Sequence, residues 1–207
     1  MNYQWARDFT LQMINQYSMS GKKIPETYNN QADYLIRIPK LLDDAAMQAA
    51  TTTAPIRELD NINNLSCDDN GGWLVYTLPA NCWQMCSGGL IQYDGRTFRR
   101  FRRYHPVGKN KIAVPKGLTG EVQVEYLRYP RLLGTDPKDE DELDNTLAVQ
   151  MALPYYAAAQ LVLQDDSYAF SALSNQFEAR LARLTERPQT DLCTVEDGYD
   201  WVGGVYG

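Results

Sequence analysis

Apolar side chains recur at helical spacing in the N-terminal quarter of the chain. A stripe at every fourth position predicts a first helix over residues 3–17. Its members are Trp5, Phe9, Met13 and Tyr17. A second stripe begins at Tyr34, and Asn29 or Asn30 before it is a natural N-cap for the helix that it predicts. Pro39 lies inside this second pattern. It should kink or split the helix, because proline removes a backbone hydrogen bond.

Between residues 56 and 130 the apolar period shortens from 3.6 towards 2, which is typical of strands. Strands are predicted over residues 73–78, 90–93, 97–104, 111–114 and 121–129. Asp94-Gly95 favours a tight hairpin turn, because a type I′ turn needs positive φ at both central residues. The pattern predicts a small antiparallel sheet or barrel of four or five strands.

Helical spacing returns after an acidic stretch, residues 136–144, which we expect to be a solvated linker. Apolar positions from Leu147 onward predict a third helix to about Gln164, with Pro154 inside it. A fourth stripe predicts a last helix that ends before Pro188. Its members are Phe170, Leu173, Phe177, Leu181 and Leu184.

The predicted fold is α+β, with a four-helix bundle frame that carries an inserted β subdomain and an extended C-terminal tail. Residues 1–55 and 143–188 form the discontinuous bundle, and residues 56–135 form the insertion. Residues 189–207 form the tail.

Composition and charge narrow the class of protein. The net charge of −6 argues against a nucleic-acid binder whose whole surface is positive. The first residues do not show the basic stretch followed by an apolar stretch that is typical of a signal peptide. No stretch approaches the roughly 18 apolar residues of a membrane span. A soluble, intracellular protein that does not contact a membrane is expected. The 14 tyrosines suit surfaces that are half packed and half wet, which favours interfaces.

Motifs that carry chemistry are absent from the sequence. The single histidine, His105, has no nucleophile elbow to serve, and the glycine pairs do not form a phosphate-binding loop. Cys82 and Cys86 lack a second Cys/His pair that would complete a metal site, so we interpret the cysteines as free thiols. We expect a structural protein without catalytic residues, bound metal or cofactor.

One stretch is strongly cationic and carries interleaved aromatic residues. Its arginines are Arg96, Arg99, Arg100, Arg102 and Arg103. Guanidinium groups pair with carboxylates of the same or a neighbouring subunit, and they also bind phosphates. We expect contact with a subunit or another protein partner, with contact to DNA and plain solvation as the alternatives.

The C-terminal tail also has two interpretations. Free ends of a chain are commonly disordered. However, aromatic residues spaced by glycines and acids favour docking into a groove of another subunit. The candidate docking residues are Tyr199, Trp201 and Tyr206.

Three helical segments together resemble the head–tail adaptor (connector) proteins of tailed bacteriophages. They are WARDFTLQMINQYS at residues 5–18, NQADYLIRIPKLLDDA at residues 30–45 and ALPYYAAAQL at residues 152–161. The resemblance covers both flanking helical regions, about half of the chain, and the β insertion is similar only in type.

This resemblance implies a virion protein at the head–tail interface, present in the host cytoplasm during assembly. It implies a ring, a dodecamer if it matches a twelvefold portal, that joins the portal protein to the tail or nozzle protein. Packaged double-stranded DNA would pass through its channel. The alternatives are a tail-completion protein of the same virion and a nucleic-acid-binding module that uses the arginine-rich hairpin.

Overall fold

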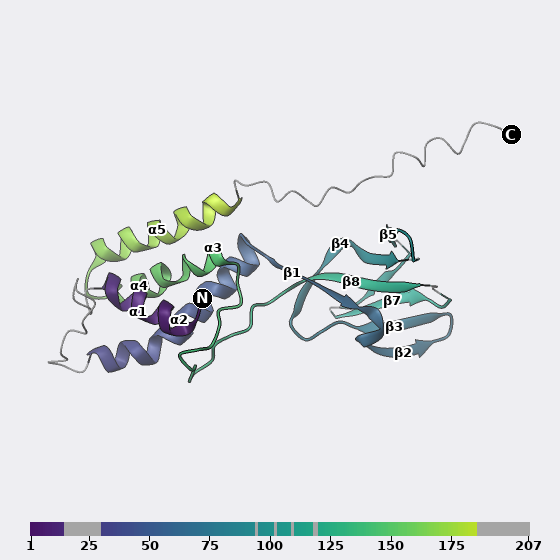
Figure 1. The fold of residues 1–207 in the computed structure, drawn as a ribbon, viewed down its shortest axis with the longest axis horizontal. Coiled ribbons are helices and arrows are strands. Elements are labelled where there is room, and N and C mark those ends of the chain that lie inside the picture. The colour runs from purple at the N-terminus through teal and green to yellow at the C-terminus, as the bar shows by residue number, and fades with distance from the viewer. Residues whose placement is uncertain (15–29, 94, 102, 109, 118–119, 186–207) are drawn as a thin grey trace, which may run out of the picture.

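The structure, a computed structural model, describes residues 1–14, 30–93, 95–101, 103–108, 110–117 and 120–185. Figure 1 shows two bodies side by side along the long axis, one of helices and one of strands. The helical body consists of α1 (Tyr3–Met13), α2 (Asn30–Thr52), α3 (Leu147–Gln150), α4 (Leu153–Val162) and α5 (Ser167–Thr185). The predicted tail, residues 189–207, lies outside the described residues.

Helix α4 lies at the centre of the helical body, and α1, α2 and α5 each pack against it. Its residues Ala157, Ala158 and Ala159 are fully buried, as is Leu153 at its start. An apolar surface that is wider than one stripe needs neighbours on more than one side. The predicted four-helix bundle frame is therefore wrong. In such a bundle each helix turns one stripe to a shared core, whereas here α4 itself occupies the core.

The prolines act differently in the two predicted helices that contain them. Pro39 lies inside α2, which continues as one helix through it. Pro154 lies at the start of α4 and separates α4 from the one-turn helix α3. Proline is well tolerated in a first turn, where its missing N–H would lack an intrahelical partner. The predicted third helix is therefore two helices.

Helix α1 turns a different face to the core from the one predicted. The buried residues are Tyr3, Ala6, Thr10 and Leu11. Trp5 and Phe9 of the predicted stripe are only half-buried. Asn2 caps the helix, since its side-chain oxygen accepts a hydrogen bond from the backbone N–H of Trp5 at 3.1 Å. Residue 17, where the predicted helix ends, lies outside the described residues.

The strands form two four-stranded antiparallel sheets, which we call the sandwich, and not one small sheet or barrel as predicted. One sheet has the order β1-β8-β4-β5 and the other β2-β3-β7-β6. Their bounds are β1 (Ile56–Asn61), β2 (Ser66–Asn70), β3 (Trp73–Thr77), β4 (Cys82–Tyr93), β5 (Phe98–Arg100), β6 (His105–Val107), β7 (Lys111–Pro115) and β8 (Glu121–Arg128). A one-turn 3₁₀ helix, Ile62–Asn64, joins β1 to β2.

A single core lies between the two sheets. Leu90, Val124 and Tyr126 enter it from one sheet, and Ile112 and Val114 from the other. Two four-stranded sheets with alternating side chains can each bury one face only against the other. The sequence pattern missed β2 because all five of its residues are exposed.

Strand β4 is interrupted by an irregularity where its register with β8 shifts between Met85 and Leu90. A Cβ atom on Gly89 would lie 2.5 Å from the backbone oxygen of Glu125, so this position accepts only glycine without a shift of the backbone. Gly89 therefore serves the close approach of β4 to β8.

The acidic stretch that precedes α3 contacts both bodies, although most of its carboxylates are exposed, as expected of a solvated linker. Asp144 accepts hydrogen bonds from the guanidinium group of Arg128 at the end of β8. This pairing lowers the pKa of Asp144. Arg7 of α1 forms an ion pair with Asp139. The backbone N–H of Tyr3 donates to the carbonyl oxygen of Asp141 at 2.7 Å.

Candidate interaction surfaces

The predicted arginines lie where the chain crosses from one sheet to the other. Strand β5 is the edge of its sheet, and all three of its residues are exposed. The chain then passes to β6, the edge of the second sheet. The single strand predicted over residues 97–104 is therefore wrong, because it breaks after Arg100. We call this surface the arginine edge: β5, with Arg96 before it and Arg103 after it.

The hairpin predicted at Asp94-Gly95 is present, because β4 and β5 pair antiparallel with Tyr93 opposite Phe98. Its loop is longer than two residues, and Asp94 lies outside the described residues. Gly95 has a φ of +91°, as the turn chemistry requires.

The four described arginines of this edge do not form one uniform row. All four are exposed, but their surroundings differ. Arg100 lies along Gly88 of β4, where a Cβ atom would come within 3.3 Å of its Nη1 atom. Arg96 and Arg100 also interact within the chain. Arg102 lies outside the described residues.

An aromatic pair stands beside these arginines. The rings of Tyr93 and Phe98 are stacked, with centroids 4.6 Å apart and planes at 25°. Phe98 is 68% exposed, although it is a large apolar side chain. Arginine beside an exposed aromatic ring is the composition of contact sites in protein interfaces and of single-stranded nucleic-acid platforms.

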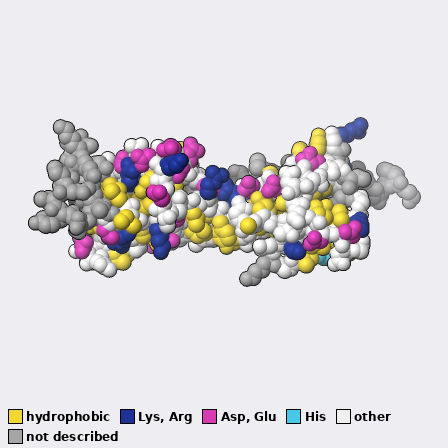
Figure 2. Space-filling view, turned by 90° about the horizontal axis from the view of Figure 1, so that it is seen from below, with side chains coloured by type: hydrophobic (Ala, Val, Ile, Leu, Met, Phe, Trp, Pro, Cys, Tyr) yellow, Lys and Arg dark blue, Asp and Glu magenta, His cyan; other side chains and the backbone are white. Residues whose placement is uncertain are grey.

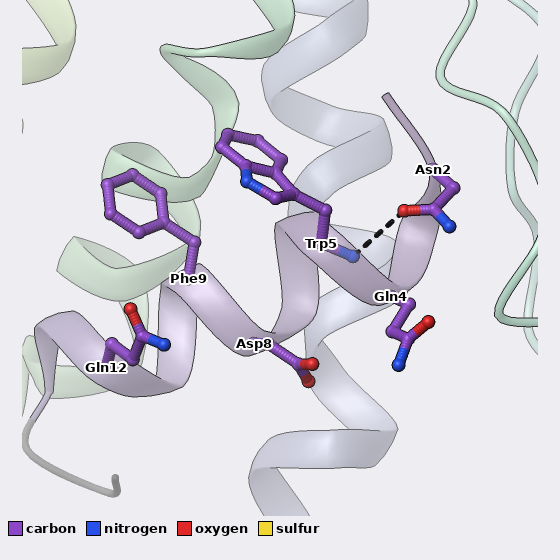
Figure 3. A pocket seen from close by; sticks show the side chains of 6 residues that line it. All are labelled: Asn2, Gln4, Trp5, Asp8, Phe9 and Gln12. Carbon is purple, nitrogen blue, oxygen red and sulfur yellow. Dashed lines mark hydrogen bonds between the residues drawn. The ribbon is translucent and has the colours of Figure 1, made fainter. Parts of the chain in front are cut away.

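A second surface, which sequence reasoning missed, is a shallow hollow of about 370 Å³ on α1. Figure 3 shows its lining, with Trp5 and Phe9 projecting from one side of the helix and Gln4 and Asp8 from the other. Asn2 and Gln12 complete the lining.

The aromatic residues of this hollow connect to two further helices. Trp5 stacks on Phe9 with centroids 5.3 Å apart, and Phe9 meets Tyr155 of α4 edge to face at 5.7 Å. Arg180 of α5 lies over the Tyr155 ring, 4.3 Å from its centroid. Its Nη2 atom donates to the Tyr155 hydroxyl oxygen at 2.8 Å. The signal in the sequence is the spacing of Trp5 and Phe9, which form an aromatic pair at i and i+4.

Large apolar side chains are exposed on both bodies. Figure 2 shows hydrophobic side chains on the helical body, on the sandwich and over the junction between them. Tyr168 is 84% exposed and Ile36 is 76% exposed in the helical body. Leu147, Leu132, Leu59 and Phe98 are also exposed. Where such groups adjoin in a contiguous patch, they mark a surface that a partner covers.

The sequence analysis singled out one histidine and two cysteines as titratable groups. His105 is exposed on β6, with its ring centroid 5.0 Å from that of Trp73. Burial raises the pKa of the Cys82 and Cys86 thiols, which disfavours the reactive thiolate. The described residues contain no group of three or more His, Cys, Asp or Glu side chains placed to hold a metal ion. Among the helices described, none is both long and apolar enough to span a membrane.

The structure brings together four of the five predicted arginines, on one edge of the sandwich. The predicted docking residues Tyr199, Trp201 and Tyr206 lie outside the described residues. Comparison with protein-family models finds no match for this chain. Comparison with curated protein sequences finds no match either.

Proposed function

We propose that this chain is a structural subunit of a head–tail adaptor ring, which joins the portal of a phage capsid to the tail. The observation that supports it best is the exposure of large apolar side chains on both bodies, Tyr168 and Ile36 on one and Phe98 and Leu59 on the other. Single exposed apolar groups also occur on proteins that work alone, but where such groups adjoin in a patch, a subunit held between neighbours covers them.

The arrangement of these surfaces suits neighbours on more than one side. The arginine edge belongs to the sandwich, and the hollow on α1 belongs to the helical body. Subunits of a ring contact one another head to tail through two different surfaces, and the ring closes when the rotation between neighbours divides a full turn evenly. The resemblance of residues 5–18, 30–45 and 152–161 to phage adaptors supports the same role.

The charge of the chain fits a channel through which DNA moves. An overall acidic wall, with a net charge of −6 per chain, does not hold the phosphate backbone. The arginine edge is a local exception, which we assign to contact with a protein partner. A tail-completion protein of the same virion would use the same surfaces with other neighbours.

One observation favours a second function, a single-stranded nucleic-acid-binding module. The stacked Tyr93 and Phe98 rings offer a base a ring to stack on, and the arginines of the same edge supply cations for phosphates. This function requires binding by the isolated chain that weakens steeply with salt.

The experiment is to measure the mass of the purified chain by light scattering after size exclusion, alone and with portal particles of candidate phages. We expect the 23.6 kDa chain to join a portal in a fixed multiple. A chain that leaves every portal unbound, but that binds single-stranded DNA at low salt, would overturn the adaptor and support the nucleic-acid module.

A further inference from the structure

The arginine edge and the C-terminal end of the chain have opposite charge. Residues 96–105 contain five arginines and no carboxylate. Residues 189–207, which we call the acidic tail, contain no Lys or Arg. Its carboxylates are Asp191, Glu196, Asp197 and Asp200. Charge complementarity of this kind selects partners and fixes their register.

The exposed backbone of β5 adds a second element to the site. Strand β5 pairs with β4 on one side and ends its sheet on the other. The N–H and C=O groups on that outer side can pair with an added strand. Side chains alternate along a strand, so Phe98 and Arg100 share one face of β5 while Arg99 lies on the opposite face.

The acidic tail carries a matching alternation. Tyr199 and Trp201 would share one face of an extended segment, with Asp200 on the other. Added along β5, such a segment sets its two aromatic rings on the face of Phe98 and Tyr93. It sets Asp200 on the face of Arg99.

We propose that the arginine edge is the docking site for the acidic tail of a neighbouring copy. The proposal rests on the ring proposed above, since a tail that passes from each copy to the next makes a head-to-tail contact. The chain from Thr185 to Asp200 reaches at most about 54 Å when extended, which exceeds the roughly 30 Å diameter of a small domain. Arg99 and Arg103 carry the contact with the carboxylates, and Phe98 and Tyr93 carry the contact with the rings.

The first experiment measures fluorescence anisotropy of a labelled synthetic peptide of residues 189–207 as a full-length chain is added. The chain carries Asp191→Asn, Glu196→Gln, Asp197→Asn and Asp200→Asn, so that its own tail does not compete. We expect saturable binding that weakens with salt. Replacement of both edge arginines, Arg99→Gln with Arg103→Gln, should lower the affinity by about tenfold or more.

Two matched controls separate this site from general attraction of charge. Lys111→Gln with Lys116→Gln removes the same charge from exposed positions on β7 and beyond its end, and should change the affinity by less than about twofold. A scrambled peptide of the same composition should bind at least about tenfold more weakly, because the alternation of rings and carboxylates is lost. Equal binding of the scrambled peptide, or an equal effect of the lysine variant, overturns the proposal.

The second experiment tests whether the tail reaches another copy. A labelled full-length chain with Arg99→Gln and Arg103→Gln keeps its tail, and the tail variant keeps its arginine edge. We expect neither to associate with itself, and the two to form a complex of twice the 23.6 kDa chain mass when mixed. Binding of the peptide without such a complex would mean that each tail stays on its own copy, which contradicts the proposal. This mixture contains no portal. Its failure would therefore not bear on the adaptor function, which the portal-binding experiment tests separately.

Discussion

The helical body and the sandwich bury their cores with different kinds of side chain. Ala157, Ala158 and Ala159 are fully buried in α4, and small side chains let the neighbouring helices approach closely. The sandwich core is built from larger groups, such as Leu90 and Tyr126, that fill the space between two sheets. The helical core also holds large side chains such as Leu42 and Phe177, so the difference lies in the alanines where α4 meets its neighbours.

This difference decides what each region tolerates. Protein interiors are packed as densely as organic crystals, so a site that holds alanine has no room for a longer side chain. A gap filled by large side chains is instead sensitive to their removal. The exposed surfaces differ as well, since the helical body offers a hollow on α1 and the sandwich offers strand edges.

The largest effect should follow removal of a core leucine from either body. Leu42→Ala in α2 and Leu90→Ala in β4 each delete a fully buried side chain and should cost about 2–5 kcal/mol of unfolding free energy. The two cores share no buried residue. Hydrogen exchange should therefore show lost protection mainly in the mutated body.

Leu132→Ala serves as the control, since Leu132 is exposed and its loss should change stability by about 0.5 kcal/mol or less. Equal loss of protection in α4 and in β8 after Leu90→Ala would contradict the separation of the two cores.

A smaller effect should follow enlargement of α4. Ala158→Leu forces extra atoms between helices that already touch and should cost about 1–3 kcal/mol, as measured by urea unfolding. Ala172→Leu on the exposed surface of α5 is the matched control, and should change stability by about 0.5 kcal/mol or less. Similar costs at the two positions would show that α4 is not the closely packed centre of the helical body.

The sequence predicted the types of most elements because local patterns carry them. The alternation of Val122, Val124 and Tyr126 in β8 and the stripe of Phe177 and Leu181 in α5 are properties of single segments, and both side-chain sets are buried. It did not predict the central place of α4, because an alanine-rich helix shows no stripe that indicates which neighbours surround it. Strand β2 was also missed, since it is exposed throughout and has no apolar period. The division of the strands between two sheets depends on long-range pairing, which local patterns do not show.

The sequence indicated which residues form the arginine edge, but not that they lie where the chain passes from one sheet to the other. Five arginines among aromatic residues indicate a contact surface from composition alone. Where the strand breaks depends on which sheet each half joins, and that pairing is long-range: β5 pairs with β4, whereas β6 pairs with β7. The tie between Arg128 and Asp144 was missed for the same reason, since an acidic run ordinarily indicates a solvated surface.

That tie at the junction of the two bodies gives a prediction with a pH dependence. The pKa of Asp144 is lowered by its hydrogen bonds to Arg128, so the ionised form stabilises the fold. Its contribution is present above the usual carboxyl pKa of about 3.9 and is lost as the pH falls through the lower pKa of the folded state. Asp144→Asn should cost about 1 kcal/mol at pH 7, and the difference from the unmodified chain should shrink at pH 3.

Urea unfolding at both pH values measures this difference, with Asp136→Asn in the same acidic stretch as the control. A difference that stays constant between pH 7 and pH 3 would show that Asp144 acts through its shape and not through its charge.

The smallest effect should come from an ion pair at the far side of the sandwich. The Oδ1 atom of Asp69 in β2 lies 2.7 Å from the Nζ atom of Lys116. Both side chains are largely exposed, at 64% and 43%, whereas those of Asp144 and Arg128 are 19% and 17% exposed. Water screens the exposed pair and competes for its hydrogen bonds, so Asp69→Asn should change the unfolding free energy by only about 0.3 kcal/mol. If it costs as much as Asp144→Asn under the same urea titration, burial is not what distinguishes the ion pair at the junction from the one at the sandwich edge.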